Sequence, residues 1–446
     1  MQYYFINLGC PKNAVDGEAM ATRLSAAGHR PARSQRSAQV LIVNTCGFIA
    51  AARSESLATL RRLAAEKRPW QILIAAGCLA EREGAELTRR VPGIDAYIGT
   101  RHWSQIVPLV EEAARRRGQA CVHLPASTAA DLVAPMERRA EGRTAYIKIA
   151  DGCDAPCAFC AIPKIKGPQR SKPRQAILAE ARALARQGVG EIILIAQDTT
   201  AYGRDLGDPG GLATLIPEIL AAAPELTWLR VMYAYPQHID QRLIDTLASD
   251  PRIVHYLDLP LQHAHPEVLR RMRRPHDVDR IARLVEDLRS AIPDIALRTT
   301  FIVGFPGETE HEFEALLEFL QTMRFDRVGI FTYSREKGTP AAEMPGQVPP
   351  RVRRERYERA MAVQQGISRS RNAEQIGRRL PVLIEGAQKG LSLGRSYRDA
   401  PEIDGLVLVE GVRRPGSFVP VEITGAMEYD LVGRPLREPV GQHERL

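Results

Sequence analysis

The chain has 446 residues, of which 44% are hydrophobic and 26% charged, with a formal net charge of +8. This composition is typical of a folded protein of two or three domains and not of a disordered or fibrous chain. No segment looks long and apolar enough to cross a membrane, and the N-terminus lacks the features of a secretion signal. Seven cysteines, an odd and sparse set, argue against a disulfide framework. We therefore expect a cytoplasmic protein that uses cysteine for metal binding or catalysis.

Three apolar runs near the N-terminus each end in a cysteine. They read YYFINLGC, VLIVNTC and ILIAAGC, and they predict strands followed by Cys10, Cys46 and Cys78. The carboxyl ends of parallel strands meet at one edge of a sheet, so these side chains can converge. One such cysteine is more often a small buried residue, but the repetition favours three ligands of an iron-sulfur cluster. Cys121 has no such setting and is interpreted as structural or incidental.

The segment CDAPCAFC places Cys153, Cys157 and Cys160 directly after a predicted strand at 146–150. Three thiolates can bind three irons of a four-iron cluster, which leaves the fourth iron open to a substrate or cofactor. Zinc ligands and simple buried thiols are the alternatives. Structural zinc sites usually have four ligands, and no further Cys or His lies close by in sequence. The spacing therefore favours a cluster that supports radical chemistry.

The central part of the chain alternates apolar runs with Arg- and Ala-rich helical segments. Such alternation gives a parallel sheet, and six strand-helix units make an open version of the eight-fold α/β barrel. The predicted strands are 146–150, 192–196, 229–234, 256–261, 298–303 and 328–333.

The last hundred residues are predicted to form a helix and a small barrel. The Arg-rich helix, 350–375, is interpreted as a solvated connection, with a nucleic-acid contact as the alternative. The runs PVLIEG, GLVLVEG and FVPVEITGAM that follow it alternate and are punctuated by Gly and Pro. Short alternating runs of this kind predict an all-β barrel.

These motifs resemble the methylthiotransferases of the radical S-adenosylmethionine (SAM) superfamily over nearly the whole chain. The likeness is carried by LGCPKNAVDGE, NTCGFI and GCLAER, by CDAPCAFCAIPKIKGPQRSKP, and by FIVGFPGETE and YSREKGTPAAEM. It implies an N-terminal open parallel α/β domain of Rossmann or flavodoxin type at 1–136. It further implies a radical SAM core with a partial (β/α)6 barrel at 137–372, and a small OB-like substrate-recognition barrel, called TRAM, at 373–446.

The resemblance also implies the cofactors and their ligands. Cys153, Cys157 and Cys160 would bind a [4Fe-4S] cluster whose open iron chelates SAM, and the three N-terminal cysteines would bind an auxiliary [4Fe-4S] cluster that carries sulfur. The radical cluster would cleave SAM to a 5'-deoxyadenosyl radical, and the substrate radical would receive a methylthio group. Further candidate SAM contacts are Glu191, Gln262, Gly304 and Glu308, although ordinary turns also explain the Gly-Glu and GFPGE patterns.

One branch of the family modifies a transfer RNA adenosine and another modifies an aspartate of the small-subunit ribosomal protein of the decoding centre. AQDTTAYGRDL, YAYPQHI, YLDLPLQHAHPEVLRRMRR and GRSYRDAPEIDG resemble the ribosomal-protein branch. From residue 376 onward ten Lys and Arg stand against ten Asp and Glu, whereas a barrel that binds RNA is expected to be clearly positive. The transfer RNA enzyme and a zinc-stabilised RNA-binding protein without catalysis remain the alternatives.

The expected partners follow from this interpretation. They are the ribosomal protein or the ribosome, an electron donor such as flavodoxin or ferredoxin, and ribosomal RNA near the target, with no membrane contact.

Overall fold

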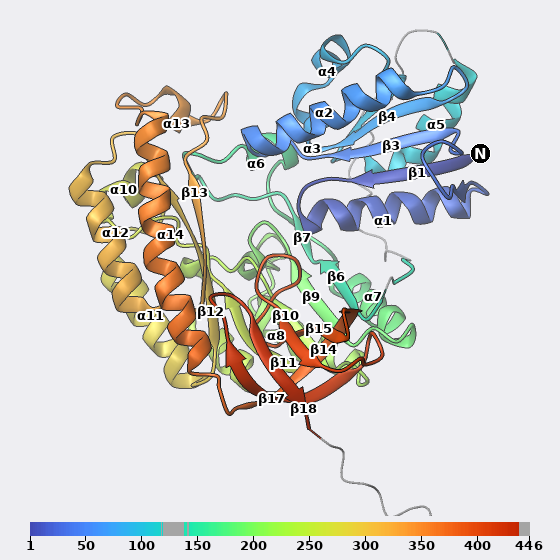
Figure 1. Cartoon of the computed structure of the whole chain (residues 1–446). Helices are drawn as coiled ribbons and strands as arrows, with labels where there is room; N and C mark the ends of the chain where they lie inside the picture. The colour runs from blue at the N-terminus through green and yellow to red at the C-terminus, as the bar shows by residue number, and fades with distance from the viewer. Residues whose placement is uncertain (117, 119–137, 141, 437–446) are drawn as a thin grey trace, which may run out of the picture. The chain divides into compact units, whose positions relative to one another are not determined.

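A computed structural model describes residues 1–116, 118, 138–140 and 142–436 (Figure 1). The chain divides into two compact units, Met1–Leu226 with Ser334–Glu343, and Thr227–Tyr333 with Met344–Leu446. This division differs from the predicted three domains. Cys121 and the predicted boundary at 136 lie outside the described residues. Among the helices of the described part, none is both long and apolar enough to cross a membrane.

The first unit opens with a five-stranded parallel sheet in the order β2-β1-β3-β4-β5. Its strands are β1 Gln2–Asn7, β2 Arg30–Pro31, β3 Val40–Thr45, β4 Ile72–Gly77 and β5 Ala96–Gly99. Every residue of β3 and β4 is buried, as in strands covered on both faces. The predicted open parallel α/β domain is confirmed.

Helices cover both faces of this sheet (Figure 1). In that view α1 runs along one face and α2 along the other, and α5 packs beside α1. Leu57, Leu60 and Leu63 of α2 recur at helical spacing and pack on Leu41 and Leu73 of the sheet. The helices are α1 Pro11–Ala26, α2 Ala50–Glu66, α3 Cys78–Glu83, α4 Ala85–Arg90, η1 Trp103–Gln105 and α5 Ile106–Arg115.

The rest of the first unit carries the start of the central α/β region. Strands β6 and β9 pair in parallel, with Thr144 opposite Glu191, and the short strands β7 and β8 pair antiparallel. The elements are β6 Thr144–Lys148, β7 Ala150–Asp151, α6 Ile162–Lys166, β8 Arg170–Ser171, α7 Arg174–Arg186, β9 Glu191–Ile195, η3 Thr199–Ala201, η4 Arg204–Leu206, α8 Gly211–Ala222 and α13 Pro340–Glu343.

The second unit continues the alternation with four parallel strands in the order β10-β11-β12-β13. All six predicted central strands are present. Strand β11 ends at Asp258 and not at 261, because Pro260 has no N–H to donate to a neighbouring strand. The elements are β10 Trp228–Val231, η5 Pro236–His238, α9 Gln241–Ala248, β11 Ile253–Asp258, α10 Pro266–Arg271, α11 Val278–Ala291, β12 Ala296–Val303, α12 Glu310–Met323, β13 Arg327–Thr332 and α14 Pro350–Ala373.

The described chain ends in a closed barrel in the order β14-β15-β16-β18-β17. Three of its strands match the predicted runs. Strands β15 and β18 were not singled out from the sequence, because Gly and Arg interrupt their apolar alternation in LSLGRS and LVGRP. The barrel strands are β14 Arg379–Gln388, β15 Leu391–Ser396, β16 Val407–Glu410, β17 Phe418–Ala426 and β18 Leu431–Pro435.

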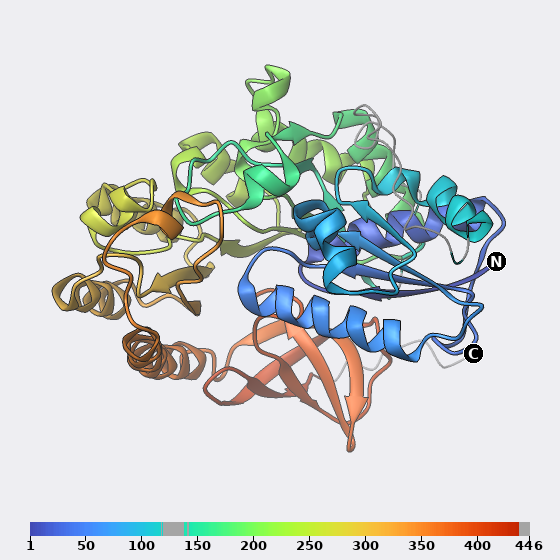
Figure 2. The same ribbon diagram turned by 90° about the horizontal axis from the view of Figure 1, so that it is seen from above.

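Within the second unit, α14 connects the parallel strands to the barrel and packs on α12 and β13. Figure 2 looks nearly along the axis of α14 and shows α12 beside it. Buried ion pairs also join the two parts: Arg327 bonds Asp399 at 2.6 Å, and Arg398 bonds Asp326 at 2.5 Å. Losing one partner of such a pair would leave a buried charge uncompensated, so these contacts fix where the barrel sits in this unit.

Candidate metal centres

The first cysteine triad is assembled from three neighbouring strand ends. Cys10 precedes α1, Cys46 follows β3, and Cys78 begins α3 directly after β4. A Cβ on Gly9 would lie 2.7 Å from the Cβ of Cys46, and a Cβ on Gly47 would lie 2.8 Å from the carbonyl carbon of Cys78. Only glycine permits approaches this close, so the three chain segments meet at one edge of the sheet.

A buried amide ties these strand ends together. The Asn13 amide donates to the carbonyls of Leu8 at 3.0 Å and Thr45 at 2.9 Å. Its oxygen accepts a hydrogen bond from the Cys78 thiol at 3.4 Å. The sequence interpretation did not single out Asn13. Its signal is a polar side chain three residues after a strand-end cysteine, in the first turn of the helix that follows.

Burial opposes ionisation of two thiols of this triad in the metal-free chain. Burial raises the pKa of the Cys46 thiol, and burial raises the pKa of Cys78 to about 12. Thiols with raised pKa values become thiolates only when a strong positive charge, such as a metal, compensates them. In the part of the chain that the structure describes, no three His, Cys, Asp or Glu side chains lie close enough for one metal ion. Three cysteines can instead bind a four-iron cluster through three of its irons, each cysteine on a different one, which leaves the fourth iron open.

The second triad lies on one loop, residues 152–169, whose ends are joined by β7 and β8. A Cβ on Gly152, which has φ +75°, would lie 2.0 Å from the carbonyl oxygen of Pro168, so this entry into the loop requires glycine. The Cys153 N–H donates to the Gly167 carbonyl at 3.2 Å, and the Cys160 N–H donates to the Cys157 carbonyl at 3.1 Å.

Backbone amides already point at the sulfurs of this loop. The N–H of Ala155 donates to Cys153 Sγ and the N–H of Ile162 donates to Cys160 Sγ, both at 3.4 Å. Such bonds stabilise anionic sulfur and tune a cluster's potential. All three cysteines are half-buried, and burial raises the pKa of Cys153 to about 11. The loop therefore fits a cluster that keeps one side open to a second ligand.

Glu191 lies at the amino end of its strand, and its SAM contact stays a prediction. This residue is fully buried at the amino end of β9 and accepts a hydrogen bond from Thr144 at 3.2 Å. The cysteine loop follows the opposite, carboxyl end of β6, where sites of parallel sheets lie. A helix-to-strand turn is a sufficient structural role for the Gly-Glu pattern. Asp198, beyond the carboxyl end of β9, lies close enough to Cys153 to raise its pKa further.

Gln262 lies beyond the carboxyl end of β11, where its backbone pairs with β12. Its N–H donates to the Thr300 carbonyl and its own carbonyl accepts from the Ile302 N–H, both at 2.8 Å. Its φ of +77° is a strained value for a residue with a side chain. The SAM contact of Gln262 stays a prediction, on the edge where it was expected.

The Glu308 carboxylate stabilises the GFPGE turn in which it lies. Its carboxylate accepts from the N–H groups of Gly304 at 2.8 Å and Phe305 at 3.1 Å, and it pairs with Arg356 at 2.9 Å. Burial raises the pKa of Glu308 despite these bonds. A Cβ on Gly304 would lie 2.1 Å from Cγ of Arg353, so packing against α14 explains this glycine. The GFPGE turn thus has a sufficient structural role, and its SAM contact stays a prediction.

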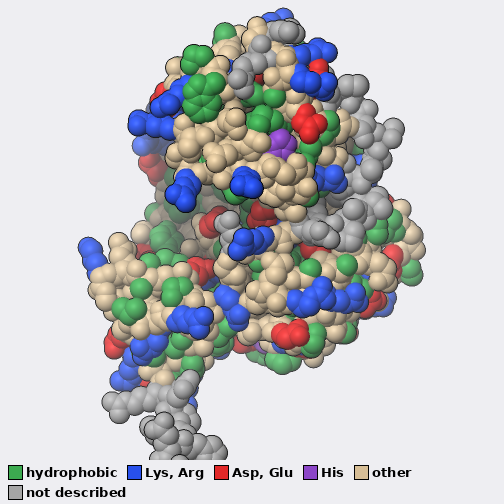
Figure 3. All heavy atoms as spheres, turned by 90° about the vertical axis from the view of Figure 1, so that its right-hand side faces the viewer, with side chains coloured by type: hydrophobic (Ala, Val, Ile, Leu, Met, Phe, Trp, Pro, Cys, Tyr) green, Lys and Arg blue, Asp and Glu red, His purple; other side chains and the backbone are tan. Residues whose placement is uncertain are grey.

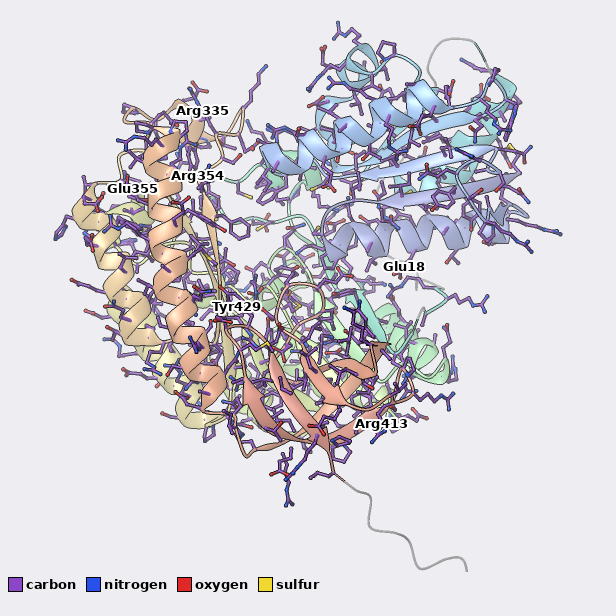
Figure 4. All side chains as sticks on the ribbon, viewed as in Figure 1. Glu18, Arg335, Arg354, Glu355, Arg413 and Tyr429 are labelled. Atoms are coloured by element: carbon purple, nitrogen blue, oxygen red, sulfur yellow. The ribbon has the colours of Figure 1, made fainter. Side chains whose placement is uncertain are left out.

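Helix α14 is only partly the solvated connection that the sequence predicted. The side chain of Arg356 is 6% exposed and neutralised by Glu308. By contrast, Arg354 is 81% exposed and pairs along the helix with Glu358. Figure 4 shows Arg354 and Glu355 pointing away from the ribbon.

Three family models match the chain. The radical SAM superfamily matches residues 147–320, the uncharacterized protein family UPF0004 matches 2–99, and the TRAM domain matches 376–436. The two cysteine triads lie inside the first two ranges. The chain is thus a radical SAM enzyme, a class that uses [4Fe-4S] clusters and SAM.

Relatives of nearly the same length show to which family of radical SAM enzymes the chain belongs. The ribosomal protein uS12 methylthiotransferase RimO of Roseiflexus castenholzii is 53% identical over 97% of this chain and 96% of its own. The protein of the same name from Chloroflexus aurantiacus is 53% identical over 98% of this chain and 100% of its own. At this identity and coverage the chain belongs to the RimO family of methylthiotransferases.

Solved structures agree on the fold. The radical SAM methyltransferase TsrM from Kitasatospora setae, with tryptophan and a SAM analogue bound, has a TM-score of 0.59 at 14% identity. The match covers 82% of this chain and 89% of that chain. Identity this low shows the fold alone, and it agrees with the predicted partial barrel.

Proposed function

We propose that this chain attaches a methylthio group to the β-carbon of an aspartate in ribosomal protein uS12. The observation that carries the proposal is the N-terminal cysteine triad: in addition to the radical loop, the first unit places Cys10, Cys46 and Cys78 at one sheet edge. A radical SAM enzyme that only abstracts hydrogen needs one cluster, whereas insertion of sulfur needs a second site to hold it. The near-complete similarity to proteins named uS12 methylthiotransferase supports the substrate.

The residues divide this work. Cys153, Cys157 and Cys160 would bind the cluster that, when present, supplies the electron for SAM cleavage, and Cys10, Cys46 and Cys78 would bind the auxiliary cluster. Gly9 and Gly47 let the chain segments that carry the N-terminal cysteines approach closely at the sheet edge. Burial of Cys46 and Cys78 excludes water from this edge. We assign these tasks to 1–136 for the auxiliary cluster, 137–372 for the radical chemistry and 373–446 for substrate recognition.

The balanced charge of the barrel region favours a protein substrate over transfer RNA. The barrel region is balanced in charge, and on the face that Figure 3 shows, Lys and Arg side chains are interspersed with Asp and Glu. An RNA-binding face is expected to carry a concentrated positive patch. We further propose action in the cytoplasm, where reduced thiols and ribosomes occur together, with electrons from a flavodoxin or ferredoxin and contact with nearby ribosomal RNA.

The test is transfer of label from SAM with an isotopic methyl group. Reconstituted enzyme is offered uS12, uS12 with the target aspartate changed to asparagine, and transfer RNA. Label in wild-type uS12 alone is expected. Label in transfer RNA, or in neither substrate while SAM is still cleaved, would overturn the proposed substrate.

A further inference from the structure

Four buried charged side chains form one cluster in the first unit: Asp16, Lys148, Asp151 and Lys166, which are at most 6% exposed. Lys148 bonds Asp16 and lies 2.9 Å from Asp151. Lys166 lies 3.3 Å from Asp16 and 3.1 Å from Asp151. Two positive and two negative groups balance each other, so the cluster is electrically neutral as a whole.

This ion cluster bridges the two cysteine triads. Asp16 lies on α1, the helix that begins after Cys10, and Asp151 comes two residues before Cys153. Lys166 ends α6, the helix that follows Cys160. The same four charges therefore tie the helix of the auxiliary site to both ends of the radical loop.

Lys166 is the member that faces the auxiliary triad. It donates to Thr100 Oγ1 at 2.9 Å, and Thr100 follows β5 at the edge where β4 ends before Cys78. The preceding residue, Ile165, packs directly on Cys78 together with Ala161. Burial opposes the charge of Lys166, yet the nearby carboxylates, and then Cys78 and Cys10 as thiolates, raise its pKa well above the usual value. The contacts of Thr100 and Ile165 place this cation on the side of the ion cluster that is nearer the auxiliary triad.

Stability alone does not account for this arrangement. Replacing a buried ion network with apolar residues of similar volume is often neutral or stabilising, because desolvation offsets the attraction. A fixed positive charge beside a cluster has a different effect, since net charge around the cluster sets its reduction potential.

We infer that Lys166 is a positioning residue whose fixed positive charge stabilises the anionic sulfur of the auxiliary cluster. The inference rests on the proposed function, because it assumes a cluster at Cys10, Cys46 and Cys78. Lys148 bonds the same two carboxylates, Asp16 and Asp151, but it does not make the contact with Thr100 that places Lys166 at the β4–β5 edge. Lys148 is therefore the matched control.

The experiment isolates the auxiliary cluster in a background with Cys153, Cys157 and Cys160 changed to Ala. Its reduction potential is measured by electron paramagnetic resonance during redox titration. Lys166→Met is expected to shift the potential to more negative values, because the reduced cluster loses a compensating charge. Lys166→Arg should restore it, and Lys148→Met should shift it less.

The possible outcomes distinguish failure of the proposed auxiliary site from failure of the Lys166 inference alone. If the background protein binds no iron, the proposed auxiliary site fails, and the inference with it. If the cluster forms but Lys166→Met leaves its potential unchanged, or Lys148→Met shifts it equally, the Lys166 inference alone fails. Should Lys166→Met not fold by circular dichroism, Asp16→Asn is compared with Asp16→Asn/Lys166→Gln, and the inference requires a lower potential in the double variant.

Discussion

Cys153, Cys157 and Cys160 share one loop closed by a two-stranded hairpin, whereas Cys10, Cys46 and Cys78 come from three strand ends of a five-stranded sheet. The loop triad needs only local geometry: one glycine, one hairpin and amides that point at sulfur. The N-terminal triad needs the order of the whole sheet, together with glycines that let neighbouring backbones touch. A site built from distant segments inherits the stability of its scaffold, whereas a loop site depends mainly on its own turns.

The largest expected effect comes from removing either triad. Changing Cys153, Cys157 and Cys160 to Ala should lower iron from about eight to about four per chain and abolish SAM cleavage. Changing the N-terminal cysteines should remove a similar amount of iron but leave SAM cleavage intact. Iron and acid-labile sulfide after anaerobic reconstitution measure both. An unchanged iron content in either variant would mean that this triad binds no cluster.

The next largest effect is expected from two single Gly→Ala changes, each of which should remove one cluster and leave the other in place. Gly47→Ala places a Cβ 2.8 Å from the backbone of Cys78. The variant should therefore lose the auxiliary cluster, which corresponds to about four irons per chain. Gly152→Ala is strained in φ and clashes with Pro168, so it should cost the radical cluster. Gly366→Ala in α14 meets nothing within 4 Å and should keep both clusters. Loss of both clusters in Gly47→Ala would show that the sites are not built independently.

A smaller effect concerns the ion cluster that joins the two triads. Asp16→Ala leaves buried positive charge uncompensated and should lower the free energy of unfolding by about 3–5 kcal/mol. Urea unfolding of the metal-free chain measures this change. The control is Glu66→Gln, which removes an exposed pair with Arg62 on α2 and should change stability by no more than about 0.5 kcal/mol. Equal effects of the two changes would contradict the role given to burial.

The smallest effect lies away from both sites. Arg354→Ala removes an exposed pair on α14 and should change the free energy of unfolding by at most about 0.5 kcal/mol, with both clusters retained. The same measurements apply. A loss of uS12 labelling with intact clusters would instead assign this basic face a role in substrate binding.

Local patterns in the sequence were sufficient for much of the fold. Apolar runs predicted the central strands to within a few residues, and Pro260 explains why β11 ends at Asp258 and not at 261. The sequence did not predict strands β15 and β18, because Gly and Arg interrupt their alternation of apolar residues. A Gly-Glu dipeptide does not reveal which end of a strand faces the site, so the SAM contact of Glu191 stays a prediction. The burial of Arg356 was also hidden, since its partner Glu308 is far away in sequence.

The sequence by itself indicated the two cysteine triads, the class of enzyme and the parallel α/β core, because motifs and apolar runs are patterns of residue type along the chain. Only the tertiary structure decided which neighbours surround those cysteines. Asn13 and Lys166 acquire their positions from sheet order and helix packing, which bring residues more than sixty positions apart into hydrogen-bond distance. Burial then determines the electrostatic effect of these contacts, because a charge excluded from water acts far more strongly on its neighbours than the same charge at the surface.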